Sequence, residues 1–319
     1  MSSFFISVVC ASKNEESDIL ELCRSFKEQK HADKELIIVD DSSDNTKKVV
    51  RDYIKKHVIN NIQIINGNRC GCCPARNLGV DLAKGDIICY MTADSYFPNN
   101  TYLSHVNIKF NTGIDAYMPN SLVANQSDLY ADFIHCWQQQ KLKLRGDRYT
   151  PLTSQGYCVK KSSAISVGLI DTIHHREIPF NVCRDWTLIK KMDEQGFTKE
   201  FDRSYFVPHT APGDFSDFFW THTQRGSISG GYNLYFRNKG RPRVFIESMI
   251  KLFRSILFYL TIFMPIKRAL ELRKFSSHNR GVMSFIKCDF VKSFSLSESY
   301  ISIANSLALC RAKIVVLFD

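Results

Sequence analysis

Three polar clusters in the first hundred residues hold the side chains best suited to chemistry. They are Ser12–Glu15, Asp40–Asp44 and Thr92–Ser95, and a short apolar run precedes each of them. Carboxylate oxygens in such clusters can hold Mg²⁺ or Mn²⁺, or accept the N–H groups of a ligand. These clusters are therefore the first candidates for a binding or catalytic site.

The apolar runs before the clusters have the length and composition of buried strands. We expect strands near residues 6–9, 36–39, 62–65 and 87–91. Apolar residues at helical spacing predict helices near residues 19–26, 49–54 and 75–82. This alternation is typical of a parallel, doubly wound sheet, whose ligands bind beyond the carboxyl ends of the strands. The three clusters fall at that edge.

The segment after the first strand, Ala11–Glu16 (ASKNEE), lacks the GxGxxG fingerprint, which argues against an NAD or FAD site. It resembles the PTYNE-like segment of family 2 glycosyltransferases, with Ala11 and Lys13 in place of the usual proline and tyrosine. Val39–Thr46 (VDDSSDNT) resembles the VDDGSxDxT segment of the same family. Ala75–Asp86 contains ARNLG and AKGD, which are similar to the family's ARNxG and AxGD.

Further matches follow in the family's order. Thr92-Ala93-Asp94 stands where the family has its DxD motif, and Gly168–Asp171 resembles vGgFDe. Arg184–Trp186 stands where an ED or ExD motif opens a helix, and Val207–His209 carries the late histidine. The resemblance covers about residues 4–240. Each motif is weak alone, so the strength of the resemblance lies in the order that the motifs share with the family.

The resemblance implies an α/β fold of the GT-A type, with a doubly wound, mostly parallel sheet and helices on both faces. We expect this glycosyltransferase domain over residues 1–244, with a nucleotide-binding half over 1–100 and an acceptor-binding half over 101–244. Within the second half, a strand is expected over Gly156–Val159 and a helix over Trp186–Met192. Residues 245–319 are expected to form a C-terminal, amphipathic helical segment.

The resemblance also implies a nucleotide-sugar donor. The residues that would contact it are Ala11, Ser12, Glu15, Asp41, Arg76, Thr92, Ala93 and Asp94. A carboxylate at Asp41 can accept the imide N–H of uracil or thymine, or the N–H groups of guanine. Alternatively, the polar residues of this cluster cap the helix beginning near Thr46. Both roles are compatible, because Asp44 or Ser43 could cap the helix while Asp41 binds the base. Arg76 would neutralise phosphate charge or pair with Asp94, unless it is simply solvated.

A divalent cation, Mn²⁺ or Mg²⁺, is the cofactor that the resemblance implies. Thr92 replaces the first aspartate of the DxD motif, so Asp94 is the remaining carboxylate ligand. Mg²⁺ commonly keeps water and substrate phosphates as ligands, so few protein ligands can suffice. A neutral imidazole at His209 would be the second protein ligand, or else a hydrogen-bonded residue without a metal role.

An inverting transferase needs a carboxylate to take the proton from the acceptor hydroxyl. Asp185 is the predicted general base, and the alternative is a helix N-terminal acid stabilised by the macrodipole. The chain has only part of the QxxRW motif at Gln224–Gly226, so we expect a non-processive enzyme. Glycans or lipid-linked glycans are the expected acceptors.

The run from Ser255 to Ile266 is almost wholly apolar and has basic flanks at Lys251, Arg254, Lys267 and Arg268. It is shorter than the roughly 17 to 25 residues of a membrane-spanning helix. We expect one interfacial helix on an anionic membrane surface, the alternative being a core helix. The expected location is cytoplasmic, and peripheral on the inner face of the membrane.

Composition narrows the class of protein. Lys and Arg outnumber Asp and Glu by 42 to 32, which favours anionic partners, yet no zinc-finger, RNP-like or long basic segment indicates nucleic acid. The 11 cysteines are an odd number and scattered, which is typical of reduced thiols inside a cell. No basic segment precedes the apolar run after Phe4, so no signal peptide is expected.

Two other functions fit part of the pattern. Loss of the first DxD carboxylate at Thr92 would suit a nucleotide-sugar-binding protein with weakened catalysis. A nucleotidyltransferase also uses a doubly wound sheet with metal-binding carboxylates. It usually has a glycine-rich, basic loop after the first strand, and Ser12–Glu16 is acidic and contains no glycine.

Overall fold

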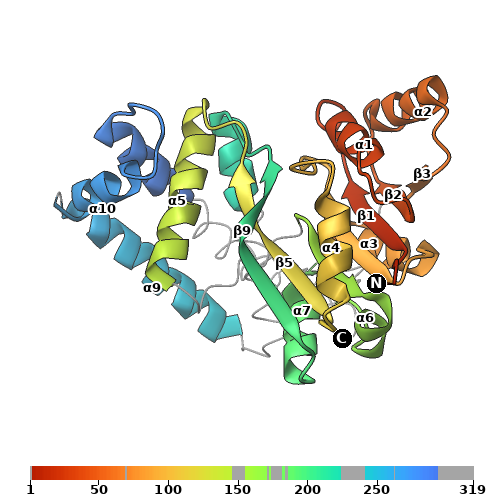
Figure 1. Ribbon diagram of the computed structural model, residues 1–319. Helices are drawn as coiled ribbons and strands as arrows, with labels where there is room; N and C mark the ends of the chain where they lie inside the picture. The colour runs from red at the N-terminus through yellow and green to blue at the C-terminus, as the bar shows by residue number, and fades with distance from the viewer. Residues whose placement is uncertain are drawn as a thin grey trace, which may run out of the picture. The chain divides into compact units, whose positions relative to one another are not determined.

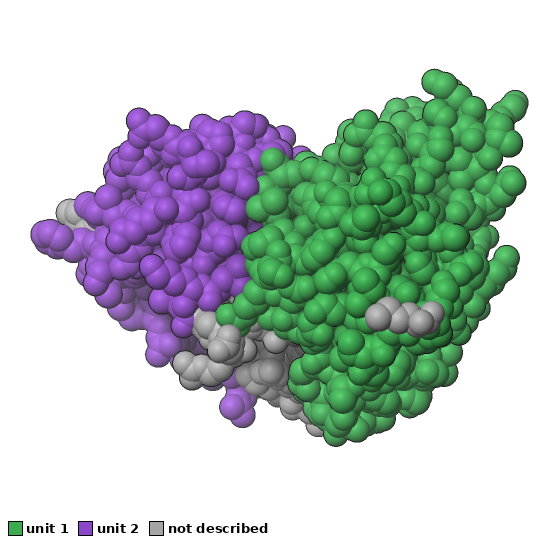
Figure 2. Space-filling model, in the orientation of Figure 1, with its two compact units in different colours: residues 1–124, 150–172, 184–210 green, residues 125–149, 173–183, 211–319 purple. Residues whose placement is uncertain are grey.

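The computed structural model describes residues 2–68, 70–145, 155–170, 172–173, 182–183, 186–223, 241–261 and 263–293 (Figure 1). The chain forms two compact units (Figure 2). Unit 1 comprises residues 1–124, 150–172 and 184–210, and unit 2 comprises residues 125–149, 173–183 and 211–319.

Unit 1 is built on a seven-stranded sheet. Its strands, in spatial order, are β3 (Ile62–Asn66), β2 (Lys34–Asp40), β1 (Ile6–Ser12), β4 (Ile87–Thr92), β6 (Tyr157–Lys160), β5 (Ala116–Val123) and β9 (Lys199–His209). The first four strands are parallel, β6 is antiparallel to both of its neighbours, and β5 and β9 are parallel. The predicted α/β fold with a mostly parallel sheet is confirmed.

Helices cover both faces of this sheet, as predicted. On one face, α1 (Ile19–Lys27), α2 (Thr46–His57) and α4 (Tyr102–Phe110) pack on a core that includes Ile6, Val8 and Cys10 of β1. On the other face, α3 (Cys72–Leu82) lies so close to β1 that a Cβ on Gly79 would be 2.4 Å from Val9 Cγ1. Because the central strands are covered on both sides, they are continuous apolar runs.

The remaining elements of unit 1 are short. Helix α6 (Lys161–Ser166) follows β6 directly, and α7 (Trp186–Glu194) precedes β9. The strand predicted over Gly156–Val159 and the helix predicted over Trp186–Met192 are therefore present. A separate two-stranded sheet consists of β7 (Thr172–Ile173) and β8 (Val182–Cys183), and residues 173–183 of it are assigned to unit 2.

The described part of unit 2 is mostly helical. It contains α5 (Leu129–Arg145), α9 (Arg241–Leu260), α10 (Phe263–Arg273) and helices over residues 215–223 and 282–293. Three buried phenylalanine rings pack between α5 and the helices over residues 215–223 and 282–293. The centroid of Phe133 lies 5.9 Å from that of Phe218 and 6.0 Å from that of Phe285. The structure thus contains C-terminal helices, as expected.

The single helix predicted over Ser255–Ile266 is wrong. Helix α9 ends at Leu260, α10 begins at Phe263, and the two are bent by 89°. Pro265 lies in the first turn of α10, where its missing N–H costs nothing, but the same residue would disrupt an unbroken helix. Within the described residues, no single helix is long and apolar enough to cross a membrane, whereas this bent pair passes that test when its two helices are taken together.

Candidate functional site

A pocket of about 260 Å³ lies at the carboxyl ends of β1, β2 and β4. The strand register places Ser12 beside Asp40 and Ala11 beside Thr92, so the loops after these strands meet. All eight residues predicted to contact the donor line this pocket: Ala11, Ser12, Glu15, Asp41, Arg76, Thr92, Ala93 and Asp94. Segments more than 80 residues apart in the sequence are thereby brought together.

Asp41 is held in the pocket by the backbone around it. Its N–H donates to the Ser12 carbonyl at 2.9 Å, and its Oδ2 accepts the Gly71 N–H at 2.9 Å. A Cβ on Gly67 would lie 2.4 Å from Oδ1, so a glycine there makes room for the carboxylate. Gly71 itself has φ 86°, which lies in the region that favours glycine.

Asp44 accepts hydrogen bonds from Thr46, the first residue of α2, although the N-cap position is Asn45 and no side-chain capping bond is made there. Its Oδ1 accepts the Thr46 N–H at 3.0 Å and the Thr46 hydroxyl at 2.6 Å, at the start of α2. Burial acts to raise the pKa of Asp44, but the hydrogen bonds from Thr46 and from nearby backbone N–H groups hold it below its usual value. The start of α2 is thereby held by Asp44, while the Asp41 carboxylate lines the pocket.

The loops after β1 and β2 are joined by side-chain hydrogen bonds. The Asn14 N–H donates to Ser42 Oγ at 2.7 Å, and the Ser43 N–H donates to Asn14 Oδ1 at 2.9 Å. The Ser42 hydroxyl in turn donates to buried Asp40 at 2.6 Å. Asn14 adopts φ 58°, a conformation that asparagine tolerates better than most residues. One wall of the pocket is thereby fixed.

Carboxylates are crowded on one side of the pocket. The pKa of Glu15 is raised to about 8, first by burial and then by the negative charges of Asp94, Asp18 and Asp44. Such crowding is unfavourable until a cation or a proton neutralises it. The site therefore favours a positively charged ligand or ion between these carboxylates.

Two buried oxygens in the pocket fit a cation. Asp94 Oδ1 and Ser12 Oγ are both buried, and neither has a hydrogen-bond partner among the described residues. Buried polar atoms are almost always paired, so such atoms indicate a missing ligand. Because hard divalent cations prefer oxygen ligands, the pocket fits Mg²⁺ or Mn²⁺.

His209 ends β9, and its chain segment pairs with that of Asp94. The Thr210 N–H donates to the Asp94 carbonyl at 2.8 Å, and the Tyr96 N–H donates to the Pro208 carbonyl at 3.2 Å. His209 Nδ1 lies 3.1 Å from the Leu122 carbonyl, which can only accept. Nδ1 also lies 3.0 Å from the Ser121 hydroxyl, which can donate or accept, so these contacts are compatible with either tautomer of the ring.

The predicted metal ligands do not form a complete site by themselves. His209 is not among the described residues that line the pocket. In the part of the chain that the structure describes, no three His, Cys, Asp or Glu side chains are grouped closely enough to hold a metal ion. Asp185, the predicted general base, and Asp171 both lie outside the described residues.

The pocket also contains residues that were not predicted to contact the donor. Lys13, Gly71 and Cys72 complete its lining together with Ala75. Lys13 stands within the first polar cluster, so its charge was a usable signal. Gly71 and Cys72 begin α3 after an irregular loop, whose path periodicity cannot predict.

Comparisons with known proteins agree with this architecture. Glycosyl transferase family 2 matches residues 7–170, just over half of the chain. A search of curated proteins found no match. Mannosyltransferase PcManGT from Pyrobaculum calidifontis, solved with GDP-Man and Mn²⁺, is 16% identical with a TM-score of 0.56, over 98% of this chain and 87% of that chain.

Two further solved structures also match this chain. A mycobacterial protein is 14% identical with a TM-score of 0.50, over 72% of this chain and 74% of that chain. TarS residues 1–349 from S. aureus are 15% identical with a TM-score of 0.49, over 95% and 91% of the two chains. The match to the family model, together with the seven-stranded sheet and the pocket at its carboxyl edge, leads to one conclusion. This chain belongs to glycosyl transferase family 2 and is a glycosyltransferase.

Proposed function

We propose that this glycosyltransferase takes a hexose from a nucleotide-sugar bound in the pocket at the ends of β1, β2 and β4. The observation that carries this proposal is the convergence of Asp41, Arg76 and Asp94 on one pocket of about 260 Å³. Asp41 supplies an acceptor for base N–H groups, Arg76 supplies a buried positive charge, and Asp94 supplies a carboxylate. A nucleoside diphosphate needs all three, and the GDP-Man and Mn²⁺ in the PcManGT structure agree with this assignment.

Within the proposed complex, Asp41 accepts N–H groups of the base. Its carboxylate is already oriented by the Gly71 N–H, so little freedom is lost when a base binds. Lys13 and Arg76 supply positive charge for the diphosphate. Arg76 is buried at 4% exposure, where an interaction between charges is stronger than in water.

Asp94 and Ser12 are the residues that would hold a divalent cation, with His209 as a further candidate ligand. Their buried oxygens fit such an ion. When bound, the cation neutralises the charge that develops on the departing nucleoside diphosphate. Because Thr92 replaces a carboxylate, we expect the substrate phosphates to supply a larger share of the ligands.

In the proposed reaction Asp185 takes the proton from the acceptor hydroxyl. The acceptor oxygen bonds to the anomeric carbon while the bond from that carbon to the phosphate oxygen breaks, so the configuration is inverted. The proton ends on Asp185 and the electron pair on the nucleoside diphosphate. One such displacement per donor gives non-processive transfer to a glycan or a lipid-linked glycan.

We also propose that the enzyme is cytoplasmic and lies on the inner face of a membrane. Support comes from α9, whose apolar stripe is exposed: Ile246 is 55%, Phe253 62% and Leu260 71% exposed. Phe263, at the start of α10, is 88% exposed. A stripe of this kind can be buried in the headgroup region, with its basic neighbours against anionic lipids.

The activity is tested by offering the full chain a panel of nucleotide-sugars together with membrane extract, with and without Mn²⁺. Mass spectrometry then identifies any glycosylated product and the released nucleoside diphosphate. A product that depends on the Asp94 carboxylate supports the proposal. Nucleotide binding with no transfer, for every donor and acceptor offered, would contradict it.

A further inference from the structure

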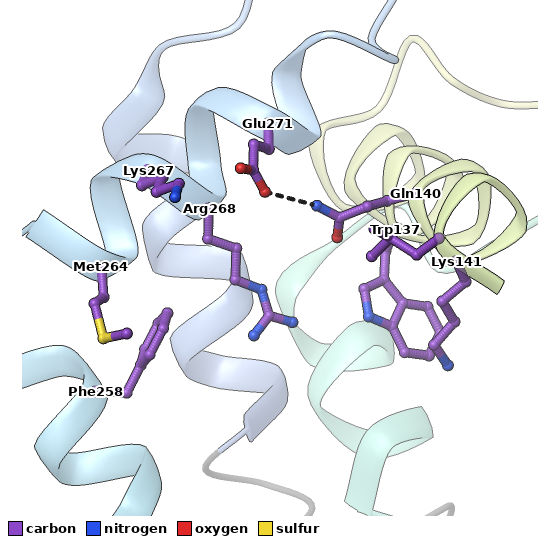
Figure 3. Close-up of a pocket in the computed structure, with 9 residues that line it drawn as sticks. Trp137, Gln140, Lys141, Phe258, Met264, Lys267, Arg268 and Glu271 are labelled. Carbon is purple, nitrogen blue, oxygen red and sulfur yellow. Dashed lines mark hydrogen bonds between the residues drawn. The ribbon is translucent and has the colours of Figure 1, made fainter.

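A second pocket, of about 420 Å³, lies within unit 2 among α5, α9 and α10 (Figure 3). One part of its lining is apolar and comes from Trp137, Leu144, Phe258 and Met264. None of these residues belongs to a sequence motif of the transferase. The pocket therefore has no role in the donor site described above.

The rest of its lining is mainly cationic. Lys141, Lys267 and Arg268 line the pocket, against the single carboxylate of Glu271. Lys141 Nζ lies 3.3 Å from the centre of the Trp137 ring, so one cation lies directly on the apolar wall. The excess positive charge favours an anionic ligand.

Arg268 is the central cation. Figure 3 shows its guanidinium pointing from α10 into the space between Phe258 and Trp137. It pairs with buried Asp289 at 3.2 Å, but Lys292 shares that carboxylate at 3.4 Å. Two cations on one carboxylate leave a net positive charge beside the pocket.

The surroundings of the pocket are exposed and apolar. Leu144 is 72% exposed and Met264 57% exposed, although both line the pocket. In the chain, Met264 follows Phe263, which is 88% exposed. A soluble anion such as phosphate would gain nothing from these side chains, whereas a lipid would bury them.

We propose that this pocket binds the phosphate of an anionic membrane phospholipid, whose acyl chains lie along the exposed apolar side chains of α9 and α10. The inference rests on the membrane location proposed above, since that location would supply the lipid. It adds a defined headgroup site to what would otherwise be an unspecific apolar and basic surface.

Binding is measured with monomeric dihexanoyl phosphatidylglycerol and the full chain, by calorimetry. In the pocket variant, Lys141→Gln is combined with Lys267→Gln. In the control, Lys143→Gln is combined with Lys274→Gln, which removes the same charge near the same two helices but outside the pocket lining. The pocket variant should bind at least about tenfold more weakly, the scale of one lost charge-assisted contact, and the control within about twofold of the parent.

Two further ligands test the chemistry. Dihexanoyl phosphatidylcholine has the same acyl chains without net charge and should bind more weakly. Inorganic phosphate and nucleoside diphosphates should not displace the anionic lipid at concentrations where the lipid itself binds. Displacement by either would make the pocket a general anion or nucleotide site and overturn the proposal, as would equal losses in the two double variants.

Sedimentation with phosphatidylglycerol vesicles separates the two proposals. If the protein binds monomeric lipid through the pocket but never sediments with vesicles, the headgroup site stands and the membrane location fails. If it sediments and the pocket and control variants lose binding equally, the membrane location stands and the headgroup site fails.

Discussion

Asp41 is the residue on which donor affinity should depend most directly. Its carboxylate lines the pocket and is oriented by the Gly71 N–H at 2.9 Å. Asp41→Ala should weaken nucleoside diphosphate binding by about 1 to 3 kcal/mol, the scale of a lost hydrogen bond to a charged group. Calorimetry with UDP and GDP measures the loss and also shows which base is preferred.

Two neighbouring substitutions serve as controls for Asp41. Asp44→Ala removes the hydrogen bonds to Thr46 at the start of α2, so it should cost about 0.5 to 1.5 kcal/mol of stability and leave nucleotide affinity nearly unchanged. Gly67→Ala should mimic Asp41→Ala, because the new methyl would lie 2.4 Å from Asp41 Oδ1. If Asp44→Ala weakens binding while Asp41→Ala does not, the two roles are reversed.

Glu15 should make stability depend on pH. Its pKa rises from 4.5 to about 8 on folding, so between these values the folded chain keeps a proton that the unfolded chain releases. The contribution of Glu15 to the free energy of unfolding is therefore fully present below pH 4.5 and is lost as the pH rises through 8. The loss is at most about 1.4 kcal/mol per pH unit.

Glu15→Gln tests this dependence. Thermal unfolding between pH 5 and 8 should show a flatter pH dependence in this variant than in the parent, because the amide does not titrate. Glu16→Gln changes the adjacent exposed carboxyl and should leave the parent's slope intact. Parallel slopes in Glu15→Gln and the parent would assign the pH dependence to another group.

At the residue scale, sequence reasoning found the pocket side chains that follow strands. Ser12, Asp41 and Asp94 end apolar runs, and parallel strands bring such ends to one edge. Gly71 and Cys72 were missed because they enter the pocket from the loop before α3. That loop's path depends on tertiary contacts such as the Gly71 bond to Asp41, which no local pattern contains.

At the scale of elements, the central strands were the most predictable part of the fold. Ile87–Met91 is buried throughout, and burial on both faces leaves an uninterrupted apolar run in the sequence. The break between α9 and α10 was not predicted, because hydropathy is continuous across it and only Pro265 indicates a new helix. A single proline is a weak signal, since it is also tolerated in the first turn of a helix.

The exposed stripe of α9 and α10 should control membrane binding. Placing Asp at Ile256 and Phe263 should release the protein from anionic liposomes, because charged side chains oppose insertion of this face. Both positions are exposed, at 46% and 88%, so the melting temperature should change little. Vesicle sedimentation with parallel thermal unfolding checks both expectations. A parent protein that never sediments, with a variant that unfolds, would show that the stripe is core.

At the scale of the whole molecule, donor binding and chemistry should be separable. Asp185→Asn keeps the size of the side chain and removes the proposed base. Transfer should therefore fall by roughly 10²- to 10⁴-fold, with donor affinity and melting temperature nearly unchanged. Asp94→Asn should instead lose donor affinity and its Mn²⁺ dependence together, because that carboxylate acts through the cation.

Thr92→Asp provides the converse experiment. Restoring the carboxylate typical of the family should tighten Mn²⁺ binding, measured by calorimetry without donor. Full transferase activity in Asp185→Asn would show that another group takes the proton, with Asp171 and His209 as the next candidates. Mn²⁺ binding that neither Asp94→Asn nor Thr92→Asp alters would place the ion elsewhere.

Two chains can share this fold with little sequence identity. The PcManGT structure superimposes over 98% of this chain at 16% identity. Many different apolar side chains can fill the same core, so a fold can be kept at such low identity.

The position of Cys72 offers a way to measure donor binding without an acceptor. Cys72 lines the pocket proposed for the donor and is exposed, whereas Cys10, Cys23, Cys73, Cys89, Cys136, Cys158 and Cys288 are buried and Cys70 is partly exposed. A fluorophore attached to this thiol would sit at the rim of the site and report its occupancy directly. Donors could then be ranked by titration, with no turnover, no acceptor and no membrane, and the preferred nucleotide would narrow the search for the natural reaction.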